Sequence, residues 1–297
     1  SSWSDGSSTF KVLAFRMGKY HTAVLQSGRA KKIKPLPAEI RTLGRGQRLK
    51  RSDAPPPVEK APPRSVRTVD IDPLLVTYHN PASVEAEIFK ILRSNILFPK
   101  NSGPPPRTIL VTSAIPGDGK SFVAANLAVS MAQGVEDHVM IMDCDLRRST
   151  LHRRFGFHDD VPGLSDYLSR RQPLESLLKK TAVNKLTILP SGPSPPNPSE
   201  LLSSPAMREL LAEVRDRYPD RYIILDSPPP QLTAETTALA KYVDGIILVV
   251  KYASTPKALL TELVEKLGKE KIIGVVMNSY RVPMTERYKY GKYTKYA

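Results

Sequence analysis

SAIPGDGKSFVAANLA, from Ser113 to Ala128, is the stretch that decides the fold of this chain. It follows an apolar run, Thr108–Val111, that predicts a short buried strand, and it leads into a helical pattern over Ser121–Gln133. A strand, a tight glycine-rich turn and a helix start are typical of a phosphate-binding P-loop. The alternative is a glycine-containing turn before an ordinary core helix, but such a turn has no need of the Lys-Ser pair. The sequence therefore predicts a site for a nucleotide triphosphate.

Most polar groups of this loop have a task at a triphosphate. Gly117 and Gly119 let backbone N–H groups turn inward around phosphate oxygens. Lys120 adds a point charge for the β- and γ-phosphates, and the hydroxyl of Ser121 is placed to hold Mg²⁺. The helix start adds its partial positive charge. The candidate nucleotide-binding residues of the loop are Gly117, Asp118, Gly119, Lys120, Ser121 and Phe122.

Beyond the loop, short apolar runs alternate with helical patterns. Strands buried on both faces that alternate with helices predict a doubly wound, mainly parallel α/β sheet of the P-loop NTPase type. The expected strands are His138–Met142, Leu186–Leu189, Arg221–Leu225, Gly245–Val250 and Ile272–Met277, and the expected helices include Pro205–Tyr218, Thr233–Lys241 and Thr255–Leu267.

Residues 1–69 differ from the rest of the chain, because they are basic and rich in proline. We expect this extension to be mostly disordered. Within it, Thr9–Leu25 mixes apolar and basic residues, which favours either a short amphipathic helix for a membrane or partner, or no structure at all. Met17 is an alternative natural start of the chain.

Residues 70–278 are expected to form the folded domain, in which a leading helix and linker, residues 70–106, precede the P-loop. Asn80-Pro81 is typical of a helix start with proline at the first position. Apolar residues then recur at the spacing of one helix face, at Val84, Ile88, Ile91 and Leu92. The pattern predicts a helix that runs to about Ile96.

The net charge of +15 lies at the two ends of the chain. Residues 1–69 hold 15 Lys/Arg and 4 Asp/Glu, residues 279–297 hold 5 and 1, and residues 70–278 hold 24 of each. Nucleic acid is disfavoured as a partner, because a nucleic-acid enzyme more often carries its basic surface on the folded domain. The basic ends point to arms that meet an acidic partner, anionic lipid or RNA, and solvated tails are the alternative.

Cysteine content and hydropathy exclude several classes of protein. The single cysteine, Cys144, excludes a disulfide framework and a metal–thiolate site. No apolar run reaches the roughly 18 residues of a membrane-spanning helix, and no secretory signal is evident. These features are typical of a protein of the reducing cytoplasm.

Three aspartates follow predicted strands at the edge where a doubly wound sheet binds its ligands. Asp143 and Asp145 follow one strand, and Asp226 ends an apolar run typical of a Walker B motif. Asp145 and Asp226 are candidates for orienting Mg²⁺, partly through water. Asp143 is the candidate acceptor of a proton from an attacking hydroxyl. With Lys120, these three acids are the candidate catalytic residues, because phosphoryl transfer needs positioning and charge neutralisation.

Other residues at this edge could have either a functional or a purely structural role. Asn278 ends the last strand and is a candidate for reading adenine through its amide, although the spacing alone favours a turn asparagine. Arg147 and Arg148 are candidates for phosphate binding or for pairing with a neighbouring subunit, against a simple surface role. Cys144 alternates with the aspartates and is expected to pack in the core.

The C-terminal tail, residues 279–297, gathers tyrosines between lysines. It holds five of the chain's 12 tyrosines, namely Tyr280, Tyr288, Tyr290, Tyr293 and Tyr296. No apolar periodicity would bury them. The more specific hypothesis is that these tyrosines are phosphate acceptors beside an ATP site. The alternatives are a stacking platform for single-stranded nucleic acid and an unspecific aromatic tail.

From Asn80 to the C-terminus, the chain resembles the bacterial tyrosine kinases, autokinases tied to exopolysaccharide synthesis. The resemblance rests on a Walker A segment, SAIPGDGKS, on a Walker A′ segment, IMDCDLRRSTLHRRFG, on a Walker B segment, IILDSPPP, and on the tyrosine tail. It implies ATP and Mg²⁺ as cofactors, and it favours the adenine side for Asn278. Ser149 stands where the family usually has proline, and we expect little consequence of this difference.

The resemblance also implies partners. In this family a Glu-x-x-Arg-x-x-Arg pattern packs subunits into a ring, and Glu87, Lys90 and Arg93 occupy those positions here. Lys90 cannot offer the bidentate fork of the arginine it replaces. This chain resembles the branch of the family in which the kinase is a separate cytoplasmic subunit and is not fused to a membrane protein. Such a kinase is held at the inner face of the membrane by a membrane-embedded activator, a polysaccharide co-polymerase. The basic extension would add about 1 kcal/mol per Lys/Arg near an anionic leaflet.

The leading hypothesis is a protein-tyrosine autokinase that phosphorylates its own tail and regulates exopolysaccharide or capsule synthesis and export. A nucleotide switch of the Min/Par kind shares the sheet and the P-loop. It is disfavoured, because those proteins carry a lysine five residues before the P-loop lysine, where this chain has Ile115. A regulatory pseudokinase that binds ATP is a third alternative.

Overall fold

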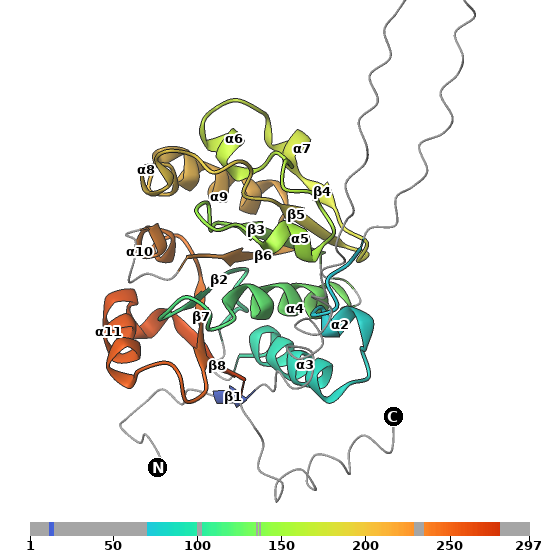
Figure 1. The fold of residues 1–297 in the computed structure, drawn as a ribbon, viewed down its shortest axis with the longest axis vertical. Coiled ribbons are helices and arrows are strands. Elements are labelled where there is room, and N and C mark those ends of the chain that lie inside the picture. Colours follow the sequence, from blue (N-terminus) through green and yellow to red (C-terminus); the bar gives the residue numbers. More distant parts are fainter. Residues whose placement is uncertain are drawn as a thin grey trace, which may run out of the picture. The chain divides into compact units, whose positions relative to one another are not determined.

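The computed structural model describes residues 12–14, 70–99, 103–134, 136, 138–228 and 235–279. They build an eight-stranded sheet in the order β1-β8-β7-β2-β6-β3-β5-β4 (Figure 1). All neighbouring strands in it are parallel except β4 and β5. This confirms the predicted mainly parallel α/β sheet. The tyrosines of the tail and most of the basic extension lie outside the described residues.

The strands agree with the sequence-based prediction to within two residues wherever one was expected. The bounds are β1 Val12–Ala14, β2 Thr108–Ser113, β3 His138–Asp143, β4 Lys179–Lys180, β5 Leu186–Leu189, β6 Arg221–Asp226, β7 Gly245–Lys251 and β8 Ile272–Asn278. All six residues of β2 are buried, as are five of the six in β3 and in β6. Continuous burial of this kind explains why these strands have unbroken apolar runs.

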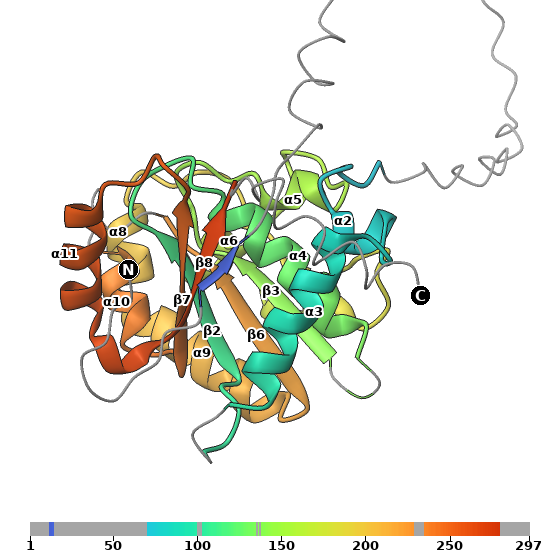
Figure 2. The same cartoon turned by 90° about the horizontal axis from the view of Figure 1, so that it is seen from below.

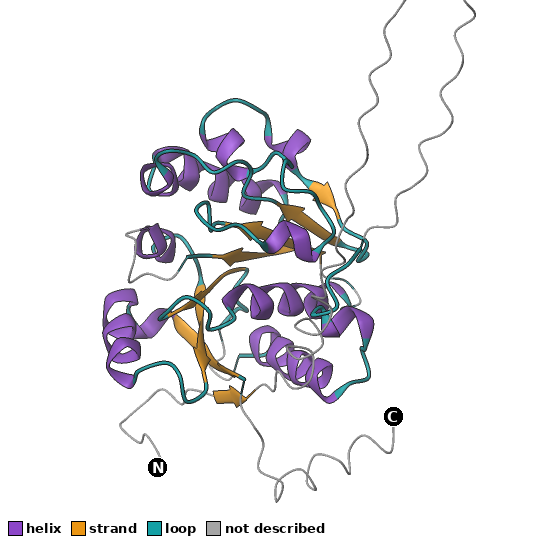
Figure 3. Cartoon of the chain, viewed as in Figure 1, coloured by secondary structure: helices purple, strands orange, loops and turns teal. Residues whose placement is uncertain are grey.

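Helices cover the sheet on both faces (Figures 2 and 3). One group packs in the core that contains Ile109 and Val111 of β2, and it consists of α2 Val76–His79, α3 Val84–Leu97, α4 Lys120–Ala132 and α5 Leu151–Arg154. The other packs in the core that contains Leu110, and it consists of α6 Leu164–Leu168, α7 Leu174–Leu177, α8 Pro198–Leu202, α9 Pro205–Arg217, α10 Glu235–Ala240 and α11 Lys257–Leu267. A 3₁₀ turn, η1 Lys269–Lys271, precedes β8. The alternation of β2 side chains between two cores defines the doubly wound sandwich.

The helix that follows the P-loop, α4, is buried on all sides. Every residue after Lys120 in this helix is buried. A helix that is apolar all round belongs in the interior, where close packing fixes its position. The glycine-rich turn therefore leads directly into the most completely buried of the described helices.

The leading helix, α3, differs from its prediction in its start and in its buried face. It begins at Val84, and the hydroxyl of Ser83 accepts a hydrogen bond from the N–H of Ala86, so Pro81 lies outside it. Of the predicted face, Leu92 is buried and Ile88 packs against the core, but Val84 and Ile91 are 40% and 50% exposed, which contradicts the other half of the prediction. The buried stripe consists of Ala86, Phe89, Leu92 and Ile96.

Shorter elements also differ from the prediction. Residues 12–14 form β1, which pairs in parallel with β8, so a helix over Thr9–Leu25 is wrong at this point. The short helices α2, α5, α6, α7 and α8 were not expected. In the part of the chain that is described, no helix is both long and apolar enough to cross a membrane.

Candidate active site at the carboxyl ends of the central strands

The candidate site lies where β2, β3 and β6 end. Asp143 of β3 and Asp226 of β6 are register partners, and Val111 of β2 is the next partner of Asp226. The P-loop continues from β2 at the same edge. The topology therefore brings two carboxylates and the glycine-rich turn together, as the sequence predicted.

The P-loop turn depends on its glycines for backbone conformation. Gly117 and Gly119 have φ angles of +86° and +96°, which residues with a side chain rarely adopt. A Cβ at Gly119 would lie 2.1 Å from Nδ2 of Asn278, so this position has no room for a side chain either. Because Gly119 caps α4 without a side-chain acceptor, the first N–H groups of the helix are left for a ligand.

Lys120 is the basic centre of the site. Its Nζ lies 3.0 Å from Oδ2 of Asp145, 3.9 Å from Oδ1 of Asp226 and 3.4 Å from Oγ of Ser121. Burial alone would lower the pKa of Lys120, but the charges of Asp226 and Asp145 outweigh it and raise this pKa. The lysine is therefore protonated at every physiological pH, and its charge is available to bind phosphate oxygens.

Asp143 is fully buried and held at both oxygens. Oδ1 accepts a hydrogen bond from the N–H of Asp145 at 3.1 Å, and Oδ2 accepts one from the hydroxyl of Ser149 at 2.8 Å. Burial and then the charge of Asp226 raise the pKa of Asp143 to about 7, against the lowering effect of the Ser149 hydroxyl. A carboxylate with a pKa near the working pH is suited to accept a proton.

Asp226 and Asp145 present the groups that a hard cation requires. Asp226 is buried, and among the described residues its Oδ1 has no hydrogen-bond partner. Burial raises the pKa of Asp226, which the charge of Lys120 partly offsets. The described residues contain no ready-made cage of three or more metal ligands. One or two carboxylates, a serine hydroxyl and phosphate oxygens are what Mg²⁺ normally uses, so this donor set fits that ion.

Three of the candidate cofactor residues and Cys144 have side chains that pack inside the protein. Asp118 is fully buried and its carboxylate accepts a hydrogen bond from Thr255. Phe122 packs edge-to-face on Phe89 with 6.0 Å between ring centroids, so only its backbone is left for a ligand. Nδ2 of Asn278 donates to the backbone carbonyl of Asp118 at 2.8 Å. Cys144 lies in a hydrophobic core, as expected, and burial raises the pKa of its thiol.

A chain of hydrogen bonds behind Asp143 was not predicted. Oγ of Ser149 lies 3.0 Å from Nδ1 of His152, and Nε2 of His152 lies 2.9 Å from Oδ1 of Asp159. His152 is buried, whereas the Asp159 side chain is 64% exposed. The chain thus connects the buried carboxylate to the surface. Its signal in the sequence is limited to a spacing of three residues between Ser149 and His152 and of seven between His152 and Asp159.

Arg147 also has a partner that the sequence did not indicate. Its guanidinium contacts Oε1 of the fully buried Glu235 at 3.1 Å and donates to Oγ of Ser199 at 3.0 Å. These contacts join the Walker A′ segment to α8 and α10. For Arg148, the described residues show only a backbone contact, from its N–H to Oδ1 of Asp145 at 3.1 Å.

The three residues expected at a subunit interface lie on α3. Nζ of Lys90 lies 2.6 Å from Oε1 of Glu87, with side chains 36% and 51% exposed. Arg93 donates to the backbone carbonyl of Ser130 on α4. Glu87 and Lys90 therefore lie at the surface, whereas Arg93 is held against its own domain.

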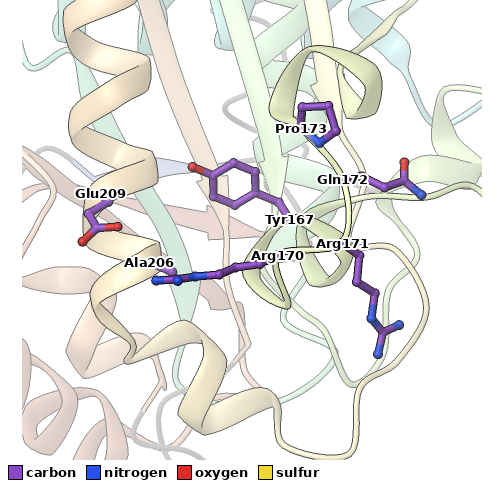
Figure 4. A pocket seen from close by; sticks show the side chains of 7 residues that line it. All are labelled: Tyr167, Arg170, Arg171, Gln172, Pro173, Ala206 and Glu209. Carbon is purple, nitrogen blue, oxygen red and sulfur yellow. The ribbon is translucent and has the colours of Figure 1, made fainter.

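A separate pocket of about 370 Å³ lies between α6 and α9 and shares no residue with this site (Figure 4). Arg170 extends along it toward Ala206. The hydroxyl of Tyr167 donates to Oε2 of Glu213 at 3.1 Å. The lining residues are Tyr167, Arg170, Arg171, Gln172, Pro173, Ala206 and Glu209.

Comparison with known proteins agrees with this geometry. The ParA family model, described as NUBPL iron-transfer P-loop NTPase, matches residues 106–289. Tyrosine-protein kinase YwqD of Bacillus subtilis is 35% identical over 218 residues, which cover 73% of this chain and 90% of YwqD. Tyrosine-protein kinase CpsD of Streptococcus agalactiae is 29% identical over 211 residues, with 70% and 90% covered.

Longer relatives and solved structures extend the comparison. Tyrosine-protein kinase wzc of Salmonella typhimurium is 32% identical over 222 residues, but they make up only 30% of its length. The chimerical protein CapA2B2 has a TM-score of 0.64 at 34% identity, over 70% of this chain and 91% of that one. The kinase domain of the Escherichia coli tyrosine kinase ETK has a TM-score of 0.63 at 27% identity, over 71% and 82%.

Proposed function

Because this chain belongs to the bacterial tyrosine-protein kinases, a branch of the ParA-type P-loop NTPases, we propose that it is an ATP- and Mg²⁺-dependent autokinase. Its acceptors are the tail tyrosines Tyr280, Tyr288, Tyr290, Tyr293 and Tyr296. The observation that carries the proposal is the convergence of Lys120, Asp145 and Asp226 beside a buried Asp143 whose pKa is raised to about 7.

Each residue of the site has a task in phosphoryl transfer. The turn at Gly117–Lys120 and the N-terminus of α4 bind the phosphates, and Nζ of Lys120 stabilises the charge of the γ-phosphoryl group. Ser121, Asp145 and Asp226 would hold Mg²⁺, which would supply charge neutralisation for the phosphates. Asp143 accepts the proton of the tyrosine hydroxyl as the tyrosine oxygen bonds to the γ-phosphorus and the bond from that phosphorus to the β-phosphate oxygen breaks, which releases ADP.

Labelled ATP tests this proposal. The native protein should incorporate label, and a variant with all five tail tyrosines changed to phenylalanine should not. The substitution Tyr78→Phe, at a tyrosine that is 38% exposed outside the tail, is the control and should leave labelling unchanged. ATP turnover without label in any of the proteins would contradict the kinase and favour a nucleotide switch.

We also propose that the tail of one subunit enters the site of its neighbour in a homo-oligomeric ring. The exposed pair of Glu87 and Lys90 supports a contact on the outer face of α3. Mixing the D143N variant with the five-phenylalanine variant tests the exchange, since only the D143N chain then carries acceptors and only its partner carries the base. Label on the D143N chain is expected, and its absence would contradict exchange between subunits.

Phosphorylation is expected to loosen this ring. Each phosphate adds about −1.5 to −2 charges, so two or three cancel the net +4 of the tail. A modified tail then leaves a site that is rich in carboxylates and phosphates. The mass of the assembly in analytical ultracentrifugation should fall as phosphorylation proceeds, and an unchanged mass would contradict the proposal.

The proposed setting is the cytoplasmic face of a membrane, together with a membrane-embedded activator of polysaccharide synthesis. This setting is what the resemblance to the bacterial tyrosine kinases implies, and the relatives named as tyrosine-protein kinases support membership of that family. The basic extension, with 15 Lys/Arg and 4 Asp/Glu, would strengthen attachment to anionic lipid. Flotation with anionic and with neutral vesicles, for the full chain and for one that lacks residues 19–68 and so keeps β1, separates lipid attraction from attachment through a partner.

A further inference from the structure

Two residues outside the P-loop contact it, one in the turn after β7 and one at the end of the neighbouring strand β8. Asp118, in the centre of the loop, is fully buried. Thr255 follows β7, and Asn278 is the last residue of β8. Thr255 contacts the side chain of Asp118, and Asn278 contacts its backbone carbonyl. We call Asp118, Thr255 and Asn278 the P-loop clasp.

Thr255 holds the side chain of Asp118. Its hydroxyl donates to Oδ1 of Asp118 at 2.9 Å and accepts a hydrogen bond from the N–H of Lys251 at 3.0 Å. The second carboxylate oxygen accepts a longer contact from the N–H of Ile115, at 3.5 Å. A buried carboxylate needs such donors, because leaving it without them is costly.

Asn278 holds the backbone of the same residue. Its Nδ2 donates to the carbonyl of Asp118 at 2.8 Å, while its Oδ1 accepts from the N–H of Ser279 at 2.8 Å. The amide also fills the space that a side chain at Gly119 would need, 2.1 Å from the Cβ position. The main chain of Asn278 is tied as well, since its carbonyl accepts from the N–H of Tyr252 at 2.9 Å.

Resting on the ATP site proposed above, we propose that Thr255 and Asn278 are positioning residues that hold the Gly117–Lys120 turn in the conformation that binds phosphates. Neither side chain has to touch the nucleotide for this role. A loop whose N–H groups are already aimed inward binds a triphosphate without having to order itself first. The clasp therefore sets the affinity for the triphosphate whatever base it carries.

This role differs in its consequences from base recognition by Asn278. A residue that reads adenine affects ATP and leaves GTP or inorganic tripolyphosphate unaffected. A residue that holds the loop affects all three ligands by the same factor. The comparison of the three ligands therefore distinguishes the roles.

The test is calorimetric titration of the full chain with Mg-ATP, Mg-GTP and Mg-tripolyphosphate. Thr255→Val keeps the volume of the side chain and removes its hydroxyl. It should weaken the binding of each ligand by about tenfold, the loss expected when one hydrogen bond to a charged group is removed. Asn278→Ala should weaken all three by a common factor too. Thr255→Ser retains the hydroxyl and should bind like the native protein.

Thr261→Val is the matched control, because among the described residues the Thr261 hydroxyl hydrogen-bonds only to the carbonyl of Lys257, one turn earlier in α11. It should leave all three affinities unchanged. The binding stoichiometry and the unfolding temperature without ligand separate positioning from misfolding. A lowered stoichiometry at native affinity would mean that Thr255→Val damages the fold, and it would overturn the inference.

Two further outcomes would also overturn it. Native affinity in Thr255→Val would show that the clasp is dispensable, and a loss confined to ATP would show that the two residues act through the base. Failure of the native protein to bind any of the three ligands would instead contradict the proposed ATP site itself.

Discussion

Oγ of Ser149 donates a hydrogen bond to Oδ2 of Asp143 over 2.8 Å. The sequence suggested little consequence for a serine at this position, but the structure places it directly on the candidate proton acceptor. The hydroxyl lowers the pKa of Asp143 and so opposes the effect of burial. Ser149 thereby helps to keep this pKa near neutrality.

Removing that hydroxyl should shift the pH dependence of the kinase. In Ser149→Ala, the carboxylate of Asp143 loses a donor, its pKa rises, and the ionised base appears only at higher pH. Initial rates of autophosphorylation between pH 5.5 and 9 should reach half of their maximum at higher pH than in the native protein. Ser176→Ala removes an exposed hydroxyl whose one hydrogen bond within the described part of the chain is to the carbonyl of Pro173, and it should not shift the profile. Coincident profiles for Ser149→Ala and the native protein would contradict the role.

Removal of the Lys120 charge should abolish phosphoryl transfer. Lys120→Met leaves Asp145 and Asp226 without their cation, and we expect at least a 10²-fold loss in rate, the scale found when one preorganised charge is removed from an active site. Lys241→Met, at an exposed lysine after α10, is the control and should keep the native rate. Measured rates that differ by less than tenfold would place the phosphates elsewhere.

Asp143 should also make the free energy of unfolding depend on pH. The unfolded chain releases this proton near an ordinary pKa of 3.8, whereas the folded protein keeps it to about 7. Between these values the unfolded state binds fewer protons, so the contribution of Asp143 to the free energy of unfolding falls as pH rises and levels off above 7. Asp143→Asn lacks this contribution.

Urea unfolding of both proteins at pH 4.5, 6 and 7.5 measures the effect. The stability of D143N relative to the native protein should increase along this series. A difference that is constant with pH would show that the Asp143 pKa is not raised by folding.

Arg147 should contribute to stability through its buried partner. Arg147→Ala leaves Glu235, which is fully buried, without its cation, and we expect a loss of about 1–3 kcal/mol in the free energy of unfolding. The partial exposure of Arg147 keeps the value below that of a wholly buried pair. Arg148→Ala is the adjacent control and should cost less than about 0.5 kcal/mol. Equal losses in both variants would contradict this role of Glu235.

The sheet and its catalytic edge were predictable because they follow from local patterns. Buried strands of a parallel sheet have continuous apolar runs, and the carboxyl ends of those strands must meet at one edge. Asp143, Asp226 and Lys120 could therefore be placed together before the structure was known. Asn278 could be placed at this edge for the same reason, but the contacts of Thr255 and Asn278 with Asp118 could not be predicted, because they depend on how loops 137 and 160 residues apart in sequence pack.

The error in α3 has a physical cause. Val84 and Ile91 fit one helix face as well as Phe89 and Ile96 fit the buried one, so periodicity alone left two candidate faces. The choice is made by tertiary packing, in which Phe89 meets Phe122 of α4. The hydrogen-bond chain from Ser149 through His152 to Asp159 was missed for a related reason, since its geometry depends on how α5 and the following loop pack.

Mass-spectrometric mapping of phosphotyrosine after incubation with ATP and Mg²⁺ is the decisive measurement. The native protein should carry phosphate on the tyrosines of residues 280–297, and the D143N and Lys120→Met variants should carry almost none there. Consumption of ATP by the native protein with its tail tyrosines unmodified would contradict the assignment of this site as a tyrosine kinase.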